Sequence, residues 1–173
     1  RNEQATLPLL LDDLSHQTLE NFEIICVNDE SDDNTLEIIK AAKVSYIEIS
    51  GRPNGWMGKT WACQVGGEHA TGELLLFIDA DVRIGPKTLN NLVKAYLKEQ
   101  HVISVQPYHM VDKFFEQFAF FFNVIGVAAN GAGFPYSKKK AGLFGPVILM
   151  SKSDFVKIDG YHGVKGSIIE DVE

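Results

Sequence analysis

Two acidic residues separated by one position, Asp79 and Asp81, directly follow the five apolar residues 74–78. Carboxylates at this spacing, at the end of a buried strand, converge on hard divalent cations such as Mg²⁺ or Mn²⁺. These ions take oxygen ligands and bridge substrate phosphates. The competing interpretation is an Asp-rich turn that caps the next helix, and for an isolated pair it is the more common one. The preceding apolar strand and the motifs described next favour a metal site.

A second polar cluster starts at Asn28 and follows the apolar run 22–27. Asp32 or Asp33 is predicted to cap the helix that comes next, which is a structural role. Asn28 and Asp29 stand earlier, at the strand end, where their side chains can accept hydrogen bonds from a nucleotide base or ribose. Position alone supports a binding role and a turn role equally.

Residues 55–59 (GWMGK) form a glycine-containing segment that leads into a predicted helix. Backbone N–H groups at a helix start, together with one lysine, suit a diphosphate, so Lys59 is predicted to be a ligand. Trp61 is predicted to be a packing residue. The segment does not have the Walker spacing. No G-x-G-x-x-G follows a strand either, which argues against a Rossmann-type oxidoreductase.

Residues 114–122 contain six phenylalanines on a predicted helix. Packing in the core is the ordinary explanation of such a cluster. Six aromatic rings in nine residues cover more than one helical face, however. The alternative is that part of this surface meets a lipid or a lipidic acceptor.

Near the C-terminus, Glu170 and Asp171 follow an apolar pair. A carboxylate here can serve as a general base, whereas the spacing alone favours an acidic helix N-terminus stabilised by the helix dipole. His109 and His162 are single histidines in predicted loops without a metal-ligand partner in sequence. They are interpreted as structural or acceptor-contact residues.

The elements that must position these residues alternate between helices and strands. The predicted helices are residues 5–17, 35–42, 59–70, 86–98 and 151–158. The predicted strands are residues 22–27, 44–49, 74–78, 101–106 and 142–150. This order predicts an α/β fold with a parallel sheet covered on both faces, which binds ligands beyond the carboxyl ends of its strands. Asn28, Asp29, Asp79 and Asp81 all fall at such ends, and this is the main physical argument that they form one site.

Composition limits the remaining possibilities. A chain of 173 residues corresponds to one domain or most of one. The net charge of −7 argues against a general nucleic-acid binder, so a phosphorylated ligand would need local cations or a metal. Two cysteines, Cys26 and Cys63, are too few for a zinc cluster or a disulfide scaffold, and they indicate a reducing compartment.

Neither end of the chain has the character of a natural terminus, and no signal peptide opens it, so the sequence is expected to be cut from a larger protein. The nearest approach to a membrane span is residues 118–134. That stretch contains Asn123, Asn130 and three glycines, which makes it marginal against the ~20 apolar residues that a spanning helix needs.

Taken together, the motifs resemble those of family 2 glycosyltransferases, which have the GT-A fold, a Rossmann-like, mostly parallel sheet flanked by helices. The matching segments span the whole chain and are residues 1–3 (RNE), 27–31 (VNDES), 55–59 (GWMGK), 77–81 (FIDAD), 145–146 (GP) and 170–171 (ED). The G-W-x-G-K form and residues 104–109 (SVQPYH) are most similar to bacterial enzymes that glycosylate carotenoid acids of the 4,4'-diaponeurosporenoate type.

The resemblance implies one GT-A catalytic domain over residues 1–173, with a first strand ahead of Arg1 and further chain after Glu173. It also implies a nucleotide-diphosphate sugar donor, UDP-linked, a divalent cation (Mg²⁺ or Mn²⁺), and transfer with inversion. A lipidic or carotenoid acceptor is expected, with no nucleic acid as partner. The full-length protein is expected at the cytoplasmic face of the cell membrane. The alternative is a nucleotide-sugar-binding module without catalysis.

The family pattern assigns roles to individual positions. Asn28 or Asp29 matches the position that contacts the base, although the family more often has Asp where Asn28 stands. Lys59 matches a nucleotide or phosphate contact, Asp79 the acid near the ribose and the metal, and Asp81 the metal ligand. Asp171 matches the catalytic base. A carotenoid carboxylate acceptor is already ionised and would have less need of such a base. The acceptor side is assigned to Trp56, His109 and Glu170.

Overall fold

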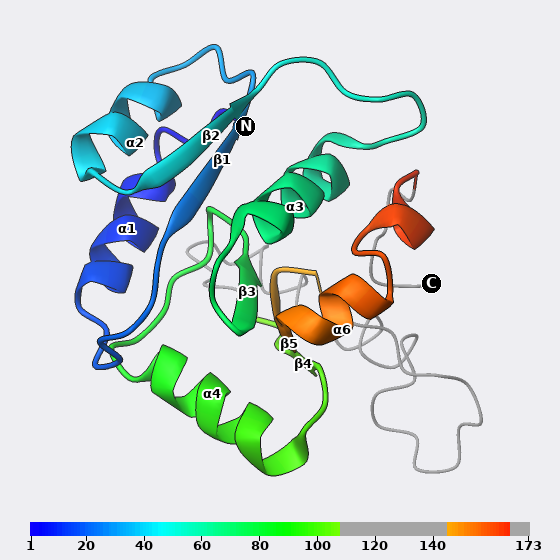
Figure 1. Ribbon diagram of the computed structural model, residues 1–173. Coiled ribbons are helices and arrows are strands. Elements are labelled where there is room, and N and C mark those ends of the chain that lie inside the picture. Colours follow the sequence, from blue (N-terminus) through cyan, green and yellow to red (C-terminus); the bar gives the residue numbers. More distant parts are fainter. Residues whose placement is uncertain (108–144, 167–173) are drawn as a thin grey trace, which may run out of the picture.

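The computed structural model describes residues 1–107 and 145–166, in which helices and strands alternate along the chain (Figure 1). The helices are α1 (Leu7–Ser15), α2 (Thr35–Ala42), α3 (Gly58–His69), α4 (Thr88–Glu99), α6 (Lys152–Lys157) and the 3₁₀ helix η2 (His162–Val164). The strands are β1 (Ile25–Asp29), β2 (Ser45–Ile49), β3 (Leu74–Ile78), β4 (Ile103–Ser104) and β5 (Val147–Ser151). The predicted α/β class is confirmed.

The strands form two hydrogen-bonded groups. β1 pairs in parallel with β2, whereas β5 lies between β3 and β4 and runs antiparallel to both. The direction of β5 is therefore a correction to the predicted parallel pairing. Its first four residues are all buried, and a strand covered on both faces has the same hydrophobic pattern in either direction. The sequence pattern could not reveal the antiparallel pairing for that reason.

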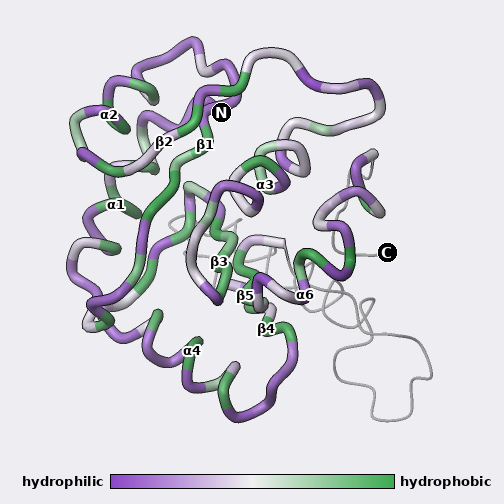
Figure 2. Tube along the Cα trace, in the orientation of Figure 1, coloured by the Kyte–Doolittle hydropathy of each residue, from purple (hydrophilic) through white to green (hydrophobic). Residues whose placement is uncertain are grey.

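Alternate residues of β5 enter two separate hydrophobic clusters. On one face Val147 and Leu149 pack with Tyr96 of α4, and on the other Ile148 packs with Phe155 of α6. Successive residues of a strand point to opposite faces, so this sheet is covered by a helix on each side. Figure 2 shows hydrophobic residues along β1 and β3 as well.

Helix α1 begins with a proline in its first turn, where the missing N–H causes no loss. Leu10 and Leu14, four positions apart on one helical face, pack against Leu89 of α4. Ahead of the helix, the N–H of Glu3 donates to Oγ1 of Thr35 at 2.8 Å. This hydrogen bond fixes the start of the chain against the first residue of α2.

Several element boundaries differ from the prediction. β1 starts at Ile25 rather than at residue 22 and continues through Asp29, because its extent is set by pairing with β2 from Ser45 to Ile49. β4 contains only two residues instead of the predicted six at 101–106. The predicted loop at residues 160–163 contains the start of the 3₁₀ helix η2. Of the predicted strand at 142–150, residues 142–144 lie outside the described part of the chain.

Asn34, and not the predicted Asp32 or Asp33, is the N-cap residue of α2, and its side chain makes no capping hydrogen bond. A carboxylate oxygen of Asp33 accepts the N–H of Thr35, the first helical residue, at 2.9 Å. At the other end of the described chain, Ser151 caps α6 by accepting the N–H of Asp154 at 2.9 Å. Within residues 1–107 and 145–166, no helix has both the length and the apolar character needed to cross a membrane.

Candidate active site

A cleft of about 610 Å³ lies between β1, the start of α3 and the end of β3. Four of the predicted site residues line it together: Asp29, Lys59, Asp79 and Asp81. They come from three elements that are distant in sequence, and they meet because two strands end and one helix begins at this edge. Such an edge is where open α/β sheets bind ligands.

The turn after β3 is held by the backbone on both sides of Asp79. The N–H of Asp79 donates to the carbonyl of Pro146 at 3.0 Å, and its own carbonyl accepts the N–H of Val82 at 3.1 Å. Val82 is buried in the core, whereas Asp81 between them is exposed. The turn thus anchors its backbone in the core and leaves the second carboxylate of the pair open to the cleft.

Lys59 is the second residue of α3 and reaches across to the end of β3. Its Nζ donates to Oδ2 of Asp79 at 3.1 Å, and both side chains are about one-third exposed. The ammonium group is therefore in the cleft, next to the first carboxylate of the pair. Lysine and the N–H groups at a helix start together favour the binding of a phosphate-bearing anion.

Asp29 is the last residue of β1 and is only 8% exposed. Its Oδ1 has no hydrogen-bond partner among the described residues, although it is buried. Its Oδ2 faces Gly58, where a Cβ atom would lie 2.7 Å away. A buried carboxylate oxygen without a partner is unfavourable by roughly 1–3 kcal/mol. This oxygen is therefore suited to accept a hydrogen bond from a bound ligand.

Asn28 is buried as well, at 5% exposed, and its Oδ1 also lacks a partner within the described residues. It is not among the residues that line the cleft, however. Adjacent strand residues point to opposite faces, so only one of Asn28 and Asp29 can face a given side. Of the two base-contact candidates, the structure brings Asp29 to the cleft.

Trp56 packs outside the cleft lining, in an aromatic cluster at the start of α3. Its ring meets Trp61 edge-on at 5.1 Å between centroids and His162 at 4.8 Å. Trp61 is thus a packing residue, as predicted. His109, Glu170, Asp171 and the phenylalanines of residues 114–122 lie outside the described residues.

Two arginines of the cleft were not predicted as site residues. Arg1 and Arg52 line it together with Lys59, and a Cβ atom at Gly58 would lie 3.3 Å from Nη1 of Arg52. These cations offset the local acids in a chain whose net charge is −7. The available signal for Arg52 was its position as a basic residue next to the Pro53-Asn54-Gly55 turn. Hydrophobic periodicity does not encode loop conformation, however, so it could not show that this side chain reaches the cleft.

The carboxylate oxygens at the cleft fit a divalent cation as ligands. Asp79 and Asp81 supply carboxylate oxygens at one cleft, which suits Mg²⁺ or Mn²⁺. Across the described ranges, no group of three or more His, Cys, Asp or Glu side chains is arranged to hold a metal ion by itself. The pair therefore fits the mode in which one or two carboxylates share the ion with substrate phosphates.

Comparison with known proteins agrees with this geometry. The sequence pattern described as Glycosyl transferase family 2 matches residues 1–145, and the chain belongs to this family. It is 36% identical over 177 residues to the 4,4'-diaponeurosporenoate glycosyltransferase of Staphylococcus haemolyticus, and 30% identical over 176 residues to that of Staphylococcus aureus. Each alignment covers 98% of this chain and 47% of the relative, so the chain spans about half the length of these curated relatives.

Solved structures share the GT-A fold. A mannosyltransferase from Pyrobaculum calidifontis, in complex with GDP-Man and Mn²⁺, matches with a TM-score of 0.63 at 20% identity, covering 96% of this chain and 47% of that one. TarS of S. aureus matches with a TM-score of 0.62 at 21% identity, covering 98% of this chain and 30% of TarS. At these identities the likeness concerns the fold.

Proposed function

We propose that this chain binds the donor in an inverting, metal-dependent hexosyltransferase, which moves a sugar from a UDP-linked donor to a lipidic or carotenoid acceptor. The observation that carries this proposal is the cleft that brings Asp29, Lys59, Asp79 and Asp81 together. The names of the relatives, which are glycosyltransferases of a carotenoid acid, support the choice of acceptor.

Different cleft residues would bind different parts of the donor. The unpartnered Oδ1 of Asp29 would accept a hydrogen bond from the base or ribose. Lys59 would bind the diphosphate and stabilise the negative charge that develops on it as the leaving group. Arg1 and Arg52 add positive charge at the same cleft, which compensates for the acidic character of the chain.

Asp81 and Asp79 would hold the divalent cation. When bound, such an ion neutralises charge on the diphosphate leaving group as the bond to the sugar breaks. The Mn²⁺ and GDP-Man named with the Pyrobaculum calidifontis structure make this assignment reasonable for a chain of the same fold.

The acceptor side is proposed to be formed by Trp56, His109 and Glu170, with Asp171 as the base that takes the acceptor proton. One contact in the described part of the chain supports this assignment. The carbonyl of Lys165, six residues before Asp171, accepts the N–H of Met57 at 2.7 Å and the hydroxyl of Thr60 at 3.0 Å. The chain that leads to Asp171 is thus anchored at the start of α3, beside Lys59.

The second candidate function is a nucleotide-sugar-binding module that does not catalyse transfer. It is favoured by the fact that the predicted residues that meet at the cleft, Asp29, Lys59, Asp79 and Asp81, are all assigned to the donor and the metal. In either case we propose that the full-length protein acts at the cytoplasmic face of the cell membrane, where a lipidic acceptor is available.

The test is a titration of the protein with UDP and with GDP, each with and without Mn²⁺. We expect metal-dependent UDP binding that is lost in Asp81→Ala and retained in Asp12→Asn, which removes an acid that does not line the cleft. Sugar transfer abolished by Asp171→Asn, with UDP binding intact, would separate the enzyme from the binding module. A UDP affinity of the wild type that is the same with and without Mn²⁺ would contradict the proposed role of Asp79 and Asp81.

A further inference from the structure

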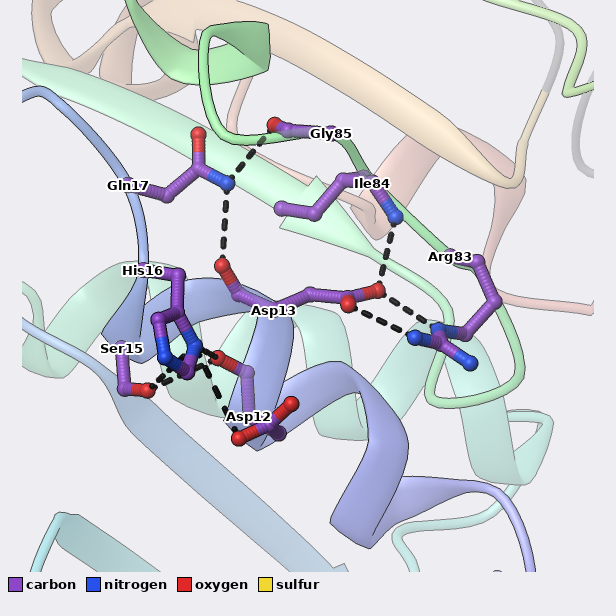
Figure 3. A network of polar contacts seen from close by, with 8 residues as sticks. All are labelled: Asp12, Asp13, Ser15, His16, Gln17, Arg83, Ile84 and Gly85. Atoms are coloured by element: carbon purple, nitrogen blue, oxygen red, sulfur yellow. Dashed lines mark hydrogen bonds and ion pairs between the residues drawn. The ribbon is translucent and has the colours of Figure 1, made fainter.

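The C-terminal turn of α1 contacts the segment that follows the metal-binding turn (Figure 3). The carboxylate of Asp13 accepts two hydrogen bonds from the guanidinium of Arg83, from Nε at 2.6 Å and from Nη2 at 2.8 Å. It also accepts the backbone N–H of Ile84 at 3.0 Å. One carboxylate therefore fixes both a side chain and the main chain of residues 83–84.

Two further residues of the same region extend this attachment. Nε2 of Gln17 donates to the carbonyl of Gly85 at 2.8 Å, and its Oε1 accepts the N–H of Leu89 at 3.1 Å. The N–H of Thr18 donates to the carbonyl of Pro86 at 2.8 Å. Asp13 of α1, together with Gln17 and Thr18 just after the helix, thus holds the main chain at several points between residues 84 and 89.

This attachment bears directly on Asp81, which stands two residues ahead of Arg83. On its N-terminal side the turn is fixed by the hydrogen bonds of Asp79, and directly after Asp81 it is fixed by the buried Val82. On its C-terminal side the backbone is fixed by Asp13. Because Asp81 itself is exposed, packing of its own side chain does not determine where its carboxylate lies.

We propose that Asp13 is a positioning residue for the metal site, holding the turn so that the carboxylate of Asp81 is set for a divalent cation. This inference rests on the proposed function. The Asp13 side chain is 12% exposed, and the paired arrangement with Arg83 restricts its orientation as well as its distance. Residues that orient metal ligands affect metal affinity although they do not touch the ion.

A matched pair of variants tests the proposal. Asp13→Asn removes the charge that pairs with Arg83. Asp12→Asn removes the same charge from the next residue, whose side chain is 67% exposed and contacts His16 of its own turn. We expect Asp13→Asn to weaken Mn²⁺-dependent UDP binding about tenfold, with metal-free UDP binding unchanged and binding restored at high Mn²⁺. Asp12→Asn should bind as the wild type does.

A second readout needs no ligand. Hydrogen exchange of the Ile84 N–H should be faster in Asp13→Asn than in Asp12→Asn, because the amide loses its charged acceptor. Arg83→Gln, a change at a half-exposed side chain, should weaken metal-dependent binding in the same way, and it replaces Asp13→Asn if that variant does not fold.

The outcomes separate this inference from the proposed function. If folded Asp13→Asn or Arg83→Gln binds Mn²⁺ and UDP with the same affinity as the wild type, the positioning role alone is overturned. An equal loss of UDP binding with and without Mn²⁺ would also overturn it, because a general structural defect has no metal dependence. Failure of the wild type to bind UDP in a metal-dependent way would overturn the proposed function and this inference with it.

Discussion

The ammonium group of Lys59 lies 3.1 Å from Oδ2 of Asp79, so the first acid of the pair that we propose to bind a metal is already bound to a cation of the protein itself. On the proposed function, Lys59 and a divalent cation would compete for the same carboxylate when no nucleotide is present. A diphosphate would give the lysine an alternative partner in its oxygens. We therefore propose that the ion pair links metal binding to donor binding.

This competition predicts opposite effects of Lys59→Met on two ligands. Mn²⁺ alone should bind several-fold more tightly, since removal of a nearby cation at a partly exposed site is worth about 1 kcal/mol. UDP with Mn²⁺ should bind about tenfold more weakly, because a phosphate contact is lost. Isothermal titration measures both. Lys40→Met, at the exposed pair with Glu37, is the control and should change neither. Weaker binding of Mn²⁺ alone would contradict the competition.

A substitution at Gly58 tests the role of Asp29 and leaves every charge in place. A Cβ atom at this position would lie 2.7 Å from Oδ2 of Asp29, so Gly58→Ala must displace the carboxylate. In a helix this substitution is otherwise favourable. We expect UDP affinity to fall at least about tenfold without loss of helix content, as measured by titration and circular dichroism. Gly163→Ala, with no atom within 4 Å of the new Cβ, should bind normally. Unchanged UDP affinity in Gly58→Ala would remove Asp29 from the site.

The two cysteines allow nucleotide binding at the cleft to be tested by alkylation. Burial raises the pKa of the Cys26 thiol to about 11, so at pH 8 only about one molecule in a thousand carries the reactive thiolate. Cys63 lines the cleft. Iodoacetamide at pH 8 should modify Cys63 first, and UDP with Mn²⁺ should slow that reaction, as followed by peptide mass spectrometry. Denatured protein, in which both cysteines react, is the control. Equal labelling of Cys63 with and without nucleotide would place the nucleotide elsewhere.

Local sequence signals were sufficient for some elements of the fold. Helix α2 begins and ends at the predicted residues, because polar turn residues precede it and Lys43 ends it in a left-handed conformation. Strand β3 was also predicted to the residue, since its five apolar positions are bounded by polar ones. The start of β1 was wrong because it depends on pairing with Ser45, and the direction of β5 was wrong because burial on both faces carries no directional signal.

The candidate site was predictable to the extent that it follows from strand ends. Asp29, Lys59, Asp79 and Asp81 meet at one cleft because the carboxyl ends of strands and the start of a helix share an edge. The contact between Asp13 and Arg83 was not predictable, since it joins residues 70 positions apart and follows no period.

Acid should reduce the stability that Asp13 provides. Hydrogen bonds from Arg83 hold the pKa of the Asp13 carboxyl below its ordinary value of 3.8. A lowered folded-state pKa means that the stabilisation is present above pH ~4 and is lost as the pH falls through the lower value. Asp13→Asn should therefore reduce the free energy of unfolding by about 1 kcal/mol at pH 7, and the difference should shrink below pH 4.

Urea denaturation at a series of pH values measures this difference. Asp12→Asn keeps the Arg83 contacts and should stay within about 0.5 kcal/mol of the wild type at pH 7. A difference between the wild type and Asp13→Asn that stays constant down to pH 3 would show that the charge of Asp13 is not what stabilises the turn.

An apolar space separates the two hydrogen-bonded groups of strands. Among the described residues, β1 pairs only with β2, and β3 pairs only with β5 and not with β1. Ile25 of β1 and Leu76 of β3 both line the cleft, and both also line a neighbouring apolar cavity of about 470 Å³. Strand edges that face a common apolar space can both pair with one added strand.

We therefore expect an extended segment to complete the sheet between β1 and β3. Arg1 itself lines the cleft, so a segment joined ahead of it would start beside this space. Addition of an alternating apolar segment of about six residues ahead of Arg1 should raise the unfolding midpoint by about 4 °C or more. The same segment with two internal prolines, which cannot donate to a strand ladder, is the matched control and should leave the midpoint unchanged. If both additions behave alike in calorimetry, the space does not accept a strand.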